Sequence, residues 1–152
     1  MTQVVFDENG YLDKYIGDAI MAFWNAPKDV PDHADRAMRT AILMQRRMND
    51  LNERWAGEAE DHEPLKVRIG VHTGEVVVGN VGGEDRFDYS AIGDAVNLAA
   101  RLEAMNKEFG TRLLIAASTA ALLERNDLVQ VSEVEVRGLS GKHPVFTLPR
   151  SN

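Results

Sequence analysis

Two segments of the chain combine apolar residues with charged and amide side chains at spacings that could support chemistry. The first segment carries Lys14 and Asp18 around an expected strand–turn–strand. The second carries Asn97 and Arg101, which lie one turn apart if the segment is helical. A cation, a carboxylate, an amide and a guanidinium held on rigid elements suit phosphoryl chemistry on a nucleotide.

The residues of the first segment also have ordinary structural explanations. A Gly-Asp pair is common at a hairpin tip, and the functional alternative for Asp18 is a carboxylate that binds a hard divalent cation. Strand alternation predicts that Lys14 lies on the same side as Leu12 and Ile16, towards a buried or interfacial face. An ammonium on such a face needs a partner, and the ring nitrogen of a purine is one.

Asn97 and Arg101 share a helix face beside an apolar stripe, so both should emerge at the edge of the core. Such a pair is usually part of a polar surface. The functional alternative is a planar guanidinium that stabilises charge on a phosphate in the transition state, with the amide orienting the ribose.

Other polar motifs give weaker signals. Residues 82–85 (Gly-Gly-Glu-Asp) partly match a diguanylate cyclase signature, but a four-residue match is weak, and we interpret the run as a surface loop. His33 and His72 have no second ligand at metal spacing, so we expect both to be structural or exposed.

Composition narrows the class of protein. A chain of 152 residues is long enough for one domain with a single core. Its net charge of −7 argues against binding to nucleic acid or to an anionic membrane surface. The absence of cysteine fits a reducing cytosol, so we expect a cytoplasmic protein. No apolar run reaches the length of a membrane span, although a longer parent protein remains free to carry an anchor.

The hydrophobic pattern alternates between the helical and the strand period, which predicts an α+β fold with a mainly antiparallel sheet covered by helices. The segments are the end of a helix in 1–8, a hairpin of 11–16 and 19–24, a long helix after Asp32, strands in 65–71 and 76–78, a glycine-rich loop in 79–86, a helix in 94–109, a strand in 112–116, a helix in 118–125, and a strand pair of 128–136 with 144–148.

Taken together, the two segments resemble the catalytic domain of the class III adenylate and guanylate cyclases. Residues 14–22 match Lys-x-Ile-Gly-Asp-x-x-Met-Ala, and residues 92–101 match Ile-Gly-Asp-x-Val-Asn-x-Ala-x-Arg. The strand of 67–75 and the turn of 136–139 extend the resemblance over roughly residues 1–148. It implies a ferredoxin-like nucleotide cyclase fold that forms a homodimer, with active sites between the protomers.

The resemblance also assigns roles position by position. Asp18 matches a metal-binding aspartate, and Lys14 matches the lysine that reads adenine N1. Ser90 stands where the family places an Asp or Thr that partners this lysine at the base. Asn97 matches the asparagine that orients the ribose, and Arg101 matches the transition-state arginine. In a homodimer, Asp18 of one chain would face the other four residues of its partner.

The implied activity is that of an adenylate cyclase, which converts ATP to 3′,5′-cyclic AMP and pyrophosphate. The ribose 3′-oxygen attacks the α-phosphorus in line, with two Mg²⁺ or Mn²⁺ ions about 3.5–4 Å apart at each site. Lys142 and Arg137 are the candidates for gripping the triphosphate. A guanylate cyclase would be expected to carry Glu near position 14, so Lys14 favours ATP, and the hydroxyl of Ser90 can accept a hydrogen bond from adenine N6.

The chain departs from the family pattern before Lys14. The family's other metal aspartate lies in a Phe-x-Asp-Ile-x-x-Phe-Thr stretch on a first strand, and this sequence has no such stretch. We therefore expect residues 1–152 to form one N-terminally incomplete cyclase domain that binds metal weakly and is inactive or weakly active without the rest of its parent. The alternatives are a non-catalytic cyclase-like module that dimerises or binds nucleotide, and a guanylate cyclase.

Overall fold

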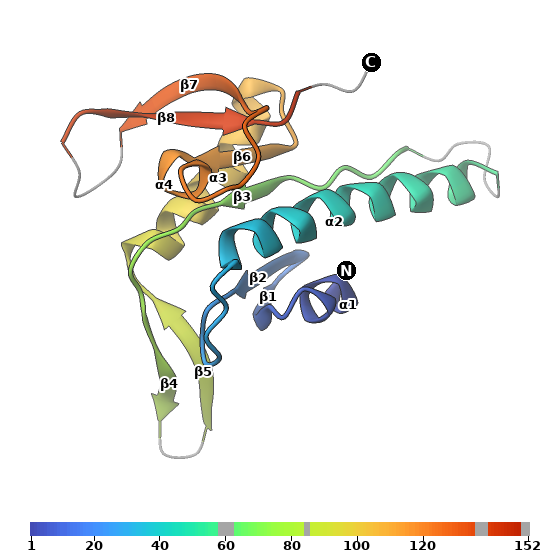
Figure 1. Ribbon diagram of the computed structural model, residues 1–152. Coiled ribbons are helices and arrows are strands. Elements are labelled where there is room, and N and C mark those ends of the chain that lie inside the picture. Colours follow the sequence, from blue (N-terminus) through green and yellow to red (C-terminus); the bar gives the residue numbers. More distant parts are fainter. Residues whose placement is uncertain (58–62, 84–85, 136–139, 150–152) are drawn as a thin grey trace.

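The computed structural model describes residues 1–57, 63–83, 86–135 and 140–149, and it confirms the α+β class (Figure 1). The elements follow in the order α1 (Thr2–Asp7), β1 (Tyr11–Ile16), β2 (Ala19–Phe23), α2 (His33–Ala56), β3 (Ile69–Val71), β4 (Val77–Gly83), β5 (Arg86–Ile92), α3 (Asp94–Phe109), β6 (Leu113–Ala116), α4 (Ala117–Ala120), β7 (Val129–Glu135) and β8 (Lys142–Thr147).

A four-stranded sheet forms the centre of the fold, with the strand order β3-β6-β8-β7. β3 and β6 are parallel, whereas β8 is antiparallel to both β6 and β7. The β1–β2 and β4–β5 hairpins are separate two-stranded antiparallel sheets. Most of the strand pairing in the described part of the chain is therefore antiparallel, as the sequence predicts.

Strand β6 is buried on both faces because helices cover the sheet from two sides. Leu114 packs in one core cluster with Leu98 and Leu102 of α3. Its neighbour Ile115 packs in another cluster with Met38 of α2. Successive side chains of a strand point to opposite faces, so one short strand of four fully buried residues joins the two helical layers.

Helix α2 is the amphipathic cover helix that its apolar spacing predicts. Asp32 precedes it, but the Asp32 side chain makes no capping hydrogen bond. Its carboxylate instead accepts hydrogen bonds from Arg36 and Arg39, at 2.7 and 3.3 Å. The C-terminal half of α2 is tied to the segment before β3, where the Asn52 amide bonds both backbone groups of Leu65.

Helix α3 lies unusually close to β3. A Cβ atom at Gly70 would come within 2.2 Å of the Ala99 carbonyl oxygen, so only glycine permits this approach. The fully buried Asn106 strengthens the contact, because its amide nitrogen lies 3.0 Å from the carbonyl oxygen of Ile69. The helix ends at Gly110, which adopts the left-handed conformation with a φ of 62°.

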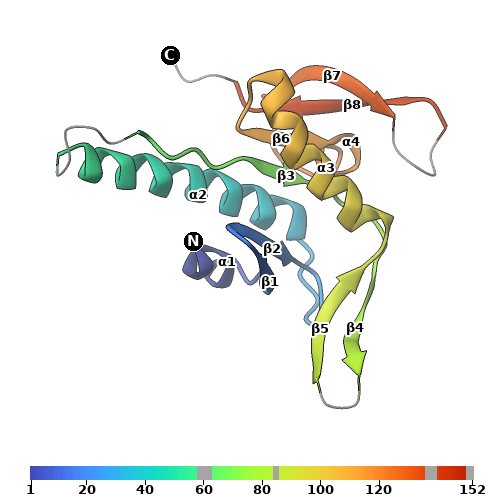
Figure 2. The ribbon, with the colours of Figure 1, turned by 180° about the vertical axis from the view of Figure 1, so that it is seen from behind.

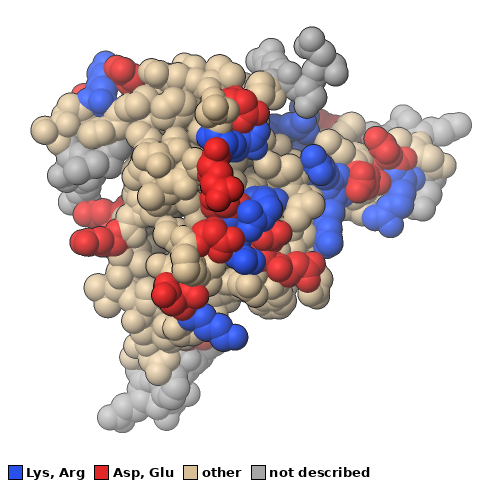
Figure 3. All heavy atoms as spheres, in the orientation of Figure 1, with Lys and Arg blue, Asp and Glu red and all other residues tan. Residues whose placement is uncertain are grey.

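The β4–β5 hairpin corrects one prediction, because residues 79–83 and 86 belong to strands and not to a glycine-rich loop. Figures 1 and 2 show this hairpin projecting away from the rest of the molecule, and Figure 3 shows few charged side chains on the near face of its described part. Its exposed apolar side chains include Val77 (77% exposed) and Ile92 (53%). The Glu84-Asp85 half of the acidic glycine motif lies outside the described residues.

Two further elements are shorter than predicted. β3 begins at Ile69 and not at Leu65, and the predicted helix of 118–125 is the single turn α4. Within the described ranges, no helix is both long and apolar enough to cross a membrane.

Candidate functional site

The candidate site is centred on Asp13, a residue that the sequence analysis did not single out. A β-bulge shifts the β1–β2 register between Leu12 and Lys14, so the regular alternation of the strand breaks at Asp13. The Asp13 side chain is fully buried. No periodic pattern marks such a bulge in advance, which is why the residue was missed.

Asp13 joins two of the predicted site residues. The Ser90 hydroxyl donates a hydrogen bond of 2.7 Å to Asp13 Oδ2, and the Ala91 backbone N–H donates to the same oxygen at 3.3 Å. The Lys14 ammonium lies 3.3 Å from the other oxygen, Asp13 Oδ1. The fold thus brings Lys14 and Ser90 to one carboxylate, although Asp13 and Ser90 are 77 positions apart in the sequence.

Three aromatic rings hold β1, β2 and β5 together beside this carboxylate. Tyr11 stacks on Phe23 with ring centroids 5.0 Å apart, and it meets Tyr89 edge-on at 5.3 Å. Phe23 and Tyr89 are 6.4 Å apart. Because Tyr89 immediately precedes Ser90, this packing fixes the position of Ser90 against β1.

The position of Lys14 differs from the expected one. Alternation placed it with Leu12 towards a buried or interfacial face, but the side chain is 44% exposed beside the buried Asp13. The bulge explains the difference, since it interrupts the two-residue period between these positions. The expectation that the ammonium needs a partner is met by Asp13.

Asn97 and Arg101 lie on α3, which follows β5 after the single residue Gly93. Both residues are exposed. The Arg101 guanidinium donates a hydrogen bond of 3.0 Å to the carbonyl oxygen of Glu135 at the end of β7. The arginine is therefore directed along the end of the central sheet. Among the described residues its guanidinium makes no other hydrogen bond, which leaves N–H groups for a ligand.

Asp18 lies at the exposed tip of the β1–β2 hairpin, next to Gly17, whose φ is 62°. In the described part of the chain, no hydrogen bond or ion pair connects Asp18 with Lys14, Ser90 or Arg101. Nor does any group of three or more His, Cys, Asp or Glu side chains among the described residues have the arrangement of a metal site. One chain thus assembles Lys14 with Ser90 but not with Asp18.

The remaining polar candidates have simpler roles. His72 Nδ1 donates to the Ala95 carbonyl oxygen at 3.2 Å, and burial lowers the pKa of His72 although this hydrogen bond raises it. His33 Nδ1 lies 3.1 Å from the carbonyl oxygen of Val30. Lys142 is exposed on β8, whereas Arg137 lies outside the described residues.

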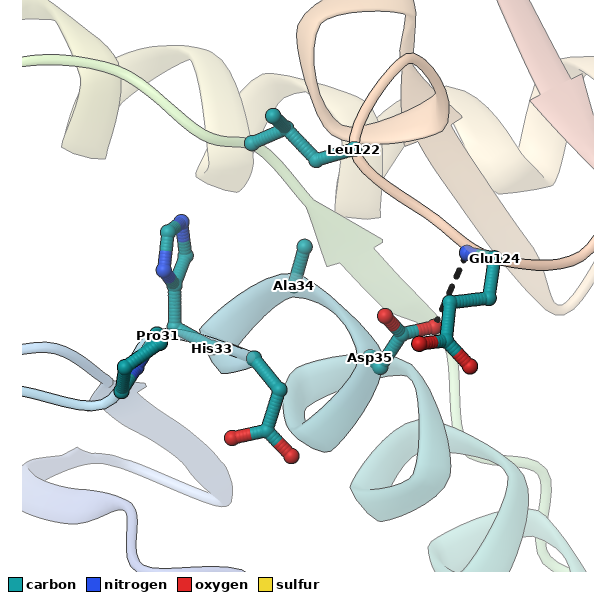
Figure 4. A pocket seen from close by; sticks show the side chains of 7 residues that line it. Pro31, His33, Ala34, Asp35, Leu122 and Glu124 are labelled. Atoms are coloured by element: carbon teal, nitrogen blue, oxygen red, sulfur yellow. Dashed lines mark hydrogen bonds between the residues drawn. The ribbon is translucent and has the colours of Figure 1, made fainter.

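A hollow of about 300 Å³ lies elsewhere, between the start of α2 and the segment after α4 (Figure 4). It is lined by Pro31, Asp32, His33, Ala34, Asp35, Leu122 and Glu124. None of these is a predicted site residue, and three of them are acidic. A triphosphate would be repelled there, so the hollow does not compete with the site around Asp13.

Comparisons with known proteins agree with the family resemblance of the sequence over nearly the whole chain. Residues 3–149 match the family model described as the adenylate and guanylate cyclase catalytic domain. Adenylate cyclase 1 of Rhizobium meliloti (strain 1021) is 40% identical over 129 residues, which are 85% of this chain and 19% of that protein. An adenylate cyclase of Anabaena cylindrica is 41% identical over 120 residues, which are 78% and 23%. This chain spans about a fifth of the length of these relatives.

Solved structures confirm the predicted nucleotide cyclase fold. The adenylyl cyclase CyaB from P. aeruginosa superposes with a TM-score of 0.84 at 28% identity, over 99% of this chain and 77% of that one. A guanylyl cyclase superposes with a TM-score of 0.79 at 29% identity, over 95% and 72%. Because proteins of both base preferences share this fold, the choice of base has to be argued from the side chains of the site.

Proposed function

Because this chain belongs to the class III adenylate and guanylate cyclase catalytic domain family, we propose that it is the catalytic domain of an adenylate cyclase. The reaction converts ATP to 3′,5′-cyclic AMP and pyrophosphate. The ribose 3′-oxygen forms a bond to the α-phosphorus and loses its proton, while the bond from the α-phosphorus to the bridging oxygen breaks and pyrophosphate leaves.

The observation that carries the choice of ATP is the meeting of Lys14 and Ser90 at Asp13. Adenine offers an acceptor at N1 and a donor at the N6 amino group, whereas guanine offers a donor at N1 and an acceptor at O6. An ammonium only donates, so Lys14 suits adenine N1. The Ser90 oxygen then accepts from N6.

Asn97 and Arg101 are proposed to act on the sugar and the phosphate. Both are exposed on the helix that follows Ser90, so a nucleotide whose base lies at Ser90 could extend along α3. A guanidinium has five N–H donors in a planar fork, which suits the charge that develops on the α-phosphate. Arg101 is assigned this role, and Asn97 is assigned the orientation of the ribose. Lys142 remains a candidate for the triphosphate.

We further propose that the active form is a homodimer in which Asp18 of one chain faces four residues of its partner, namely Lys14, Ser90, Asn97 and Arg101. Among the described residues of a single chain, Asp18 makes no hydrogen bond or ion pair with these residues, which supports a site shared between two chains. Exposed apolar side chains supply a surface for association, with Ile16 next to the hairpin tip and Val77 and Ile92 on the β4–β5 hairpin.

Dependence on Mg²⁺ or Mn²⁺, two ions per site, is part of this proposal, but the described residues do not fit a metal on their own. Asp18 is a single carboxylate, and within the described ranges no cluster completes it. We propose that 1–152 is an N-terminally incomplete domain and that the other carboxylate lies upstream in the parent reading frame. An Asp-Ile-x-x-Phe-Thr stretch within roughly fifty residues, well inside one domain, would support this.

The test is to incubate the full-length parent protein with ATP and either Mg²⁺ or Mn²⁺ and to quantify cyclic AMP and pyrophosphate. Equal amounts of the two products, abolished by a chelator, are expected. Binding of ATP without any cyclic AMP would instead identify a non-catalytic nucleotide-binding module. Preferential turnover of GTP would identify a guanylate cyclase. We place the domain in the cytosol, because a chain without cysteine needs no oxidising compartment.

Arg101→Ala tests the assigned transition-state role in the same protein. Loss of a donor that acts only in the transition state should lower kcat about a hundredfold or more while the Kd for ATP changes little. Arg47→Ala, which removes an exposed arginine of α2, should leave both values unchanged. If the affinity falls and turnover persists, Arg101 binds the ground state and the assignment is wrong.

A further inference from the structure

The buried carboxylate of Asp13 contacts Lys14 and Ser90 but has so far been given no role of its own. We propose that Asp13 is a positioning residue that sets the base preference, because it fixes the proton of the Ser90 hydroxyl and holds the Lys14 ammonium beside it. This inference rests on the proposed function, since it concerns how the same site rejects guanine.

The first step concerns the Ser90 hydroxyl. A serine hydroxyl has one proton and two lone pairs, so it can serve either as a donor or as an acceptor towards a ligand. Ser90 is only 4% exposed, and its hydroxyl donates to Asp13 Oδ2 at 2.7 Å. With the proton committed there, Ser90 can only accept hydrogen bonds from a nucleotide.

The second step concerns the orientation of the carboxylate. Asp13 Oδ2 also accepts from the Ala91 N–H on the next residue of β5, which holds the carboxylate against the backbone beside Ser90. Asp13 Oδ1 is buried and accepts no hydrogen bond within the described residues. It lies 3.3 Å from Lys14 Nζ, so Lys14 supplies the counter-charge for a side chain that water does not reach.

Together these contacts produce a site that offers one acceptor and one donor in fixed places. The acceptor at Ser90 matches the adenine N6 amino group, and the donor at Lys14 matches adenine N1. Guanine would place its O6 acceptor against the Ser90 lone pairs and its N1–H against the ammonium. Without Asp13, the hydroxyl could rotate and donate to O6, and one of the two mismatches would disappear.

The experiment compares Asp13→Leu, Asp13→Ala and Asp13→Asn in the intact protein. Leucine and alanine remove the acceptor for the Ser90 proton, so the ratio of kcat/KM for ATP over GTP should fall about tenfold or more. Inosine triphosphate, which shares O6 with GTP, should gain in parallel. In Asp13→Asn, the two donors at Oδ2 favour the amide oxygen in that place, so most of the preference should persist.

The same Asp13 substitutions in a Ser90→Ala protein distinguish a positioning role of Asp13 from a merely structural one. With Ser90→Ala in place there is no hydroxyl proton to fix, and only the contact of Asp13 with Lys14 is left to act, so Asp13→Leu should change the ATP to GTP ratio much less than it does when Ser90 is present. Asp88→Ala, an exposed acid on the same strand β5, is the matched control and should leave the ratio unchanged. Thermal unfolding of each variant checks that it folds.

Two results would overturn the proposal. One is an unchanged ATP to GTP ratio in folded Asp13→Leu or Asp13→Ala, and the other is an Asp13→Asn variant that loses its preference as fully as they do. If the protein shows no turnover, the base preference can instead be measured as the ratio of the Kd values for GTP and ATP, determined by calorimetry. A wild-type protein that prefers ATP in binding but makes no cyclic AMP would therefore refute the proposed function and leave this inference standing.

Discussion

At the scale of single residues, Lys14 is assigned two tasks. It is the counter-charge of the buried Asp13, and it is the proposed donor to adenine N1. A substitution that introduces an acid, such as Lys14→Glu, would place a second carboxylate against Asp13 and disturb folding as well as base reading. A neutral amide at this position is the more informative change.

Lys14→Gln should therefore relax the choice between ATP and GTP. A glutamine amide can donate to adenine N1 or accept from guanine N1–H, so the ratio of kcat/KM for ATP over GTP should fall about tenfold or more. Lys28→Gln, which changes an exposed lysine in a loop, is the control. An unchanged ratio in Lys14→Gln would remove Lys14 from base recognition.

At the scale of the elements, the sequence predicted those with regular periodicity well. The predicted helix of 94–109 coincides with α3, because its apolar stripe is uninterrupted and Gly110 ends it. The β1–β2 hairpin was predicted from its turn at Gly17. Lys14 and Ser90 were identified from their motifs, although nothing in the sequence showed that they share a carboxylate.

The missed features are those in which tertiary structure overrides local pattern. The glycines of 79–83 suggested a loop, yet the segment pairs with β5 over its whole length. Glycine weakens a strand but does not exclude it where the backbone hydrogen bonds to the neighbouring strand are made. The bulge at Asp13 was missed because an extra residue in one strand leaves no periodic signature. The one sequence signal for Asp13 is its position next to Lys14, whose positive charge needs a carboxylate partner on a partly buried strand.

Gly70→Ala tests the close contact between α3 and β3. The new Cβ would lie 2.2 Å from the Ala99 carbonyl oxygen and 2.5 Å from the Glu103 nitrogen, and both are backbone atoms that cannot move without displacing the helix. The free energy of unfolding, measured with urea, should fall by about 2–3 kcal/mol. Gly79→Ala meets no atom within 4 Å, so an equal loss there would show that the contact is not the cause.

His72 should make the stability of the fold depend on pH. Burial lowers its pKa below the ordinary 6.5, so the folded protein binds its proton less readily than the unfolded chain. Its contribution to stability is present above the unfolded pKa and is lost as the pH falls through the folded pKa. Urea unfolding between about pH 7.5 and pH 5.5 should show this loss, and His72→Gln should flatten the slope relative to the wild type.

At the scale of the whole molecule, the proposed site is divided between two copies of the chain. Each copy presents Lys14 and Ser90 near the base of the β4–β5 hairpin, and it presents Asp18 at the tip of another hairpin. The charges on the face drawn in Figure 3 are mixed in sign over α2, whereas the described part of the projecting hairpin shows few charges there. Association through apolar hairpins would therefore leave the charged helix face exposed.

Mixing two inactive variants tests this arrangement. Asp18→Ala and Arg101→Ala should each reduce cyclic AMP formation about a hundredfold or more, because every site in either homodimer lacks one group. In a mixed dimer with two-fold symmetry, one of the two sites is complete, so an equal mixture should recover about a quarter of the wild-type activity. If the mixture is as inactive as its components while gel filtration shows that the two chains associate, both groups act within one chain.

The separation of the three sheets has an evolutionary consequence. Within the described residues, no backbone ladder joins the β1–β2 hairpin to β5. The proposed base-reading pair is instead joined across that boundary by the Asp13 side chain, which accepts from the Ser90 hydroxyl and from the Ala91 backbone N–H. The side chains at positions 13, 14 and 90 can therefore change during evolution without breaking the hydrogen bonds within either hairpin. In this architecture, a shift in nucleotide preference would require few substitutions, provided that the charges at positions 13 and 14 change together.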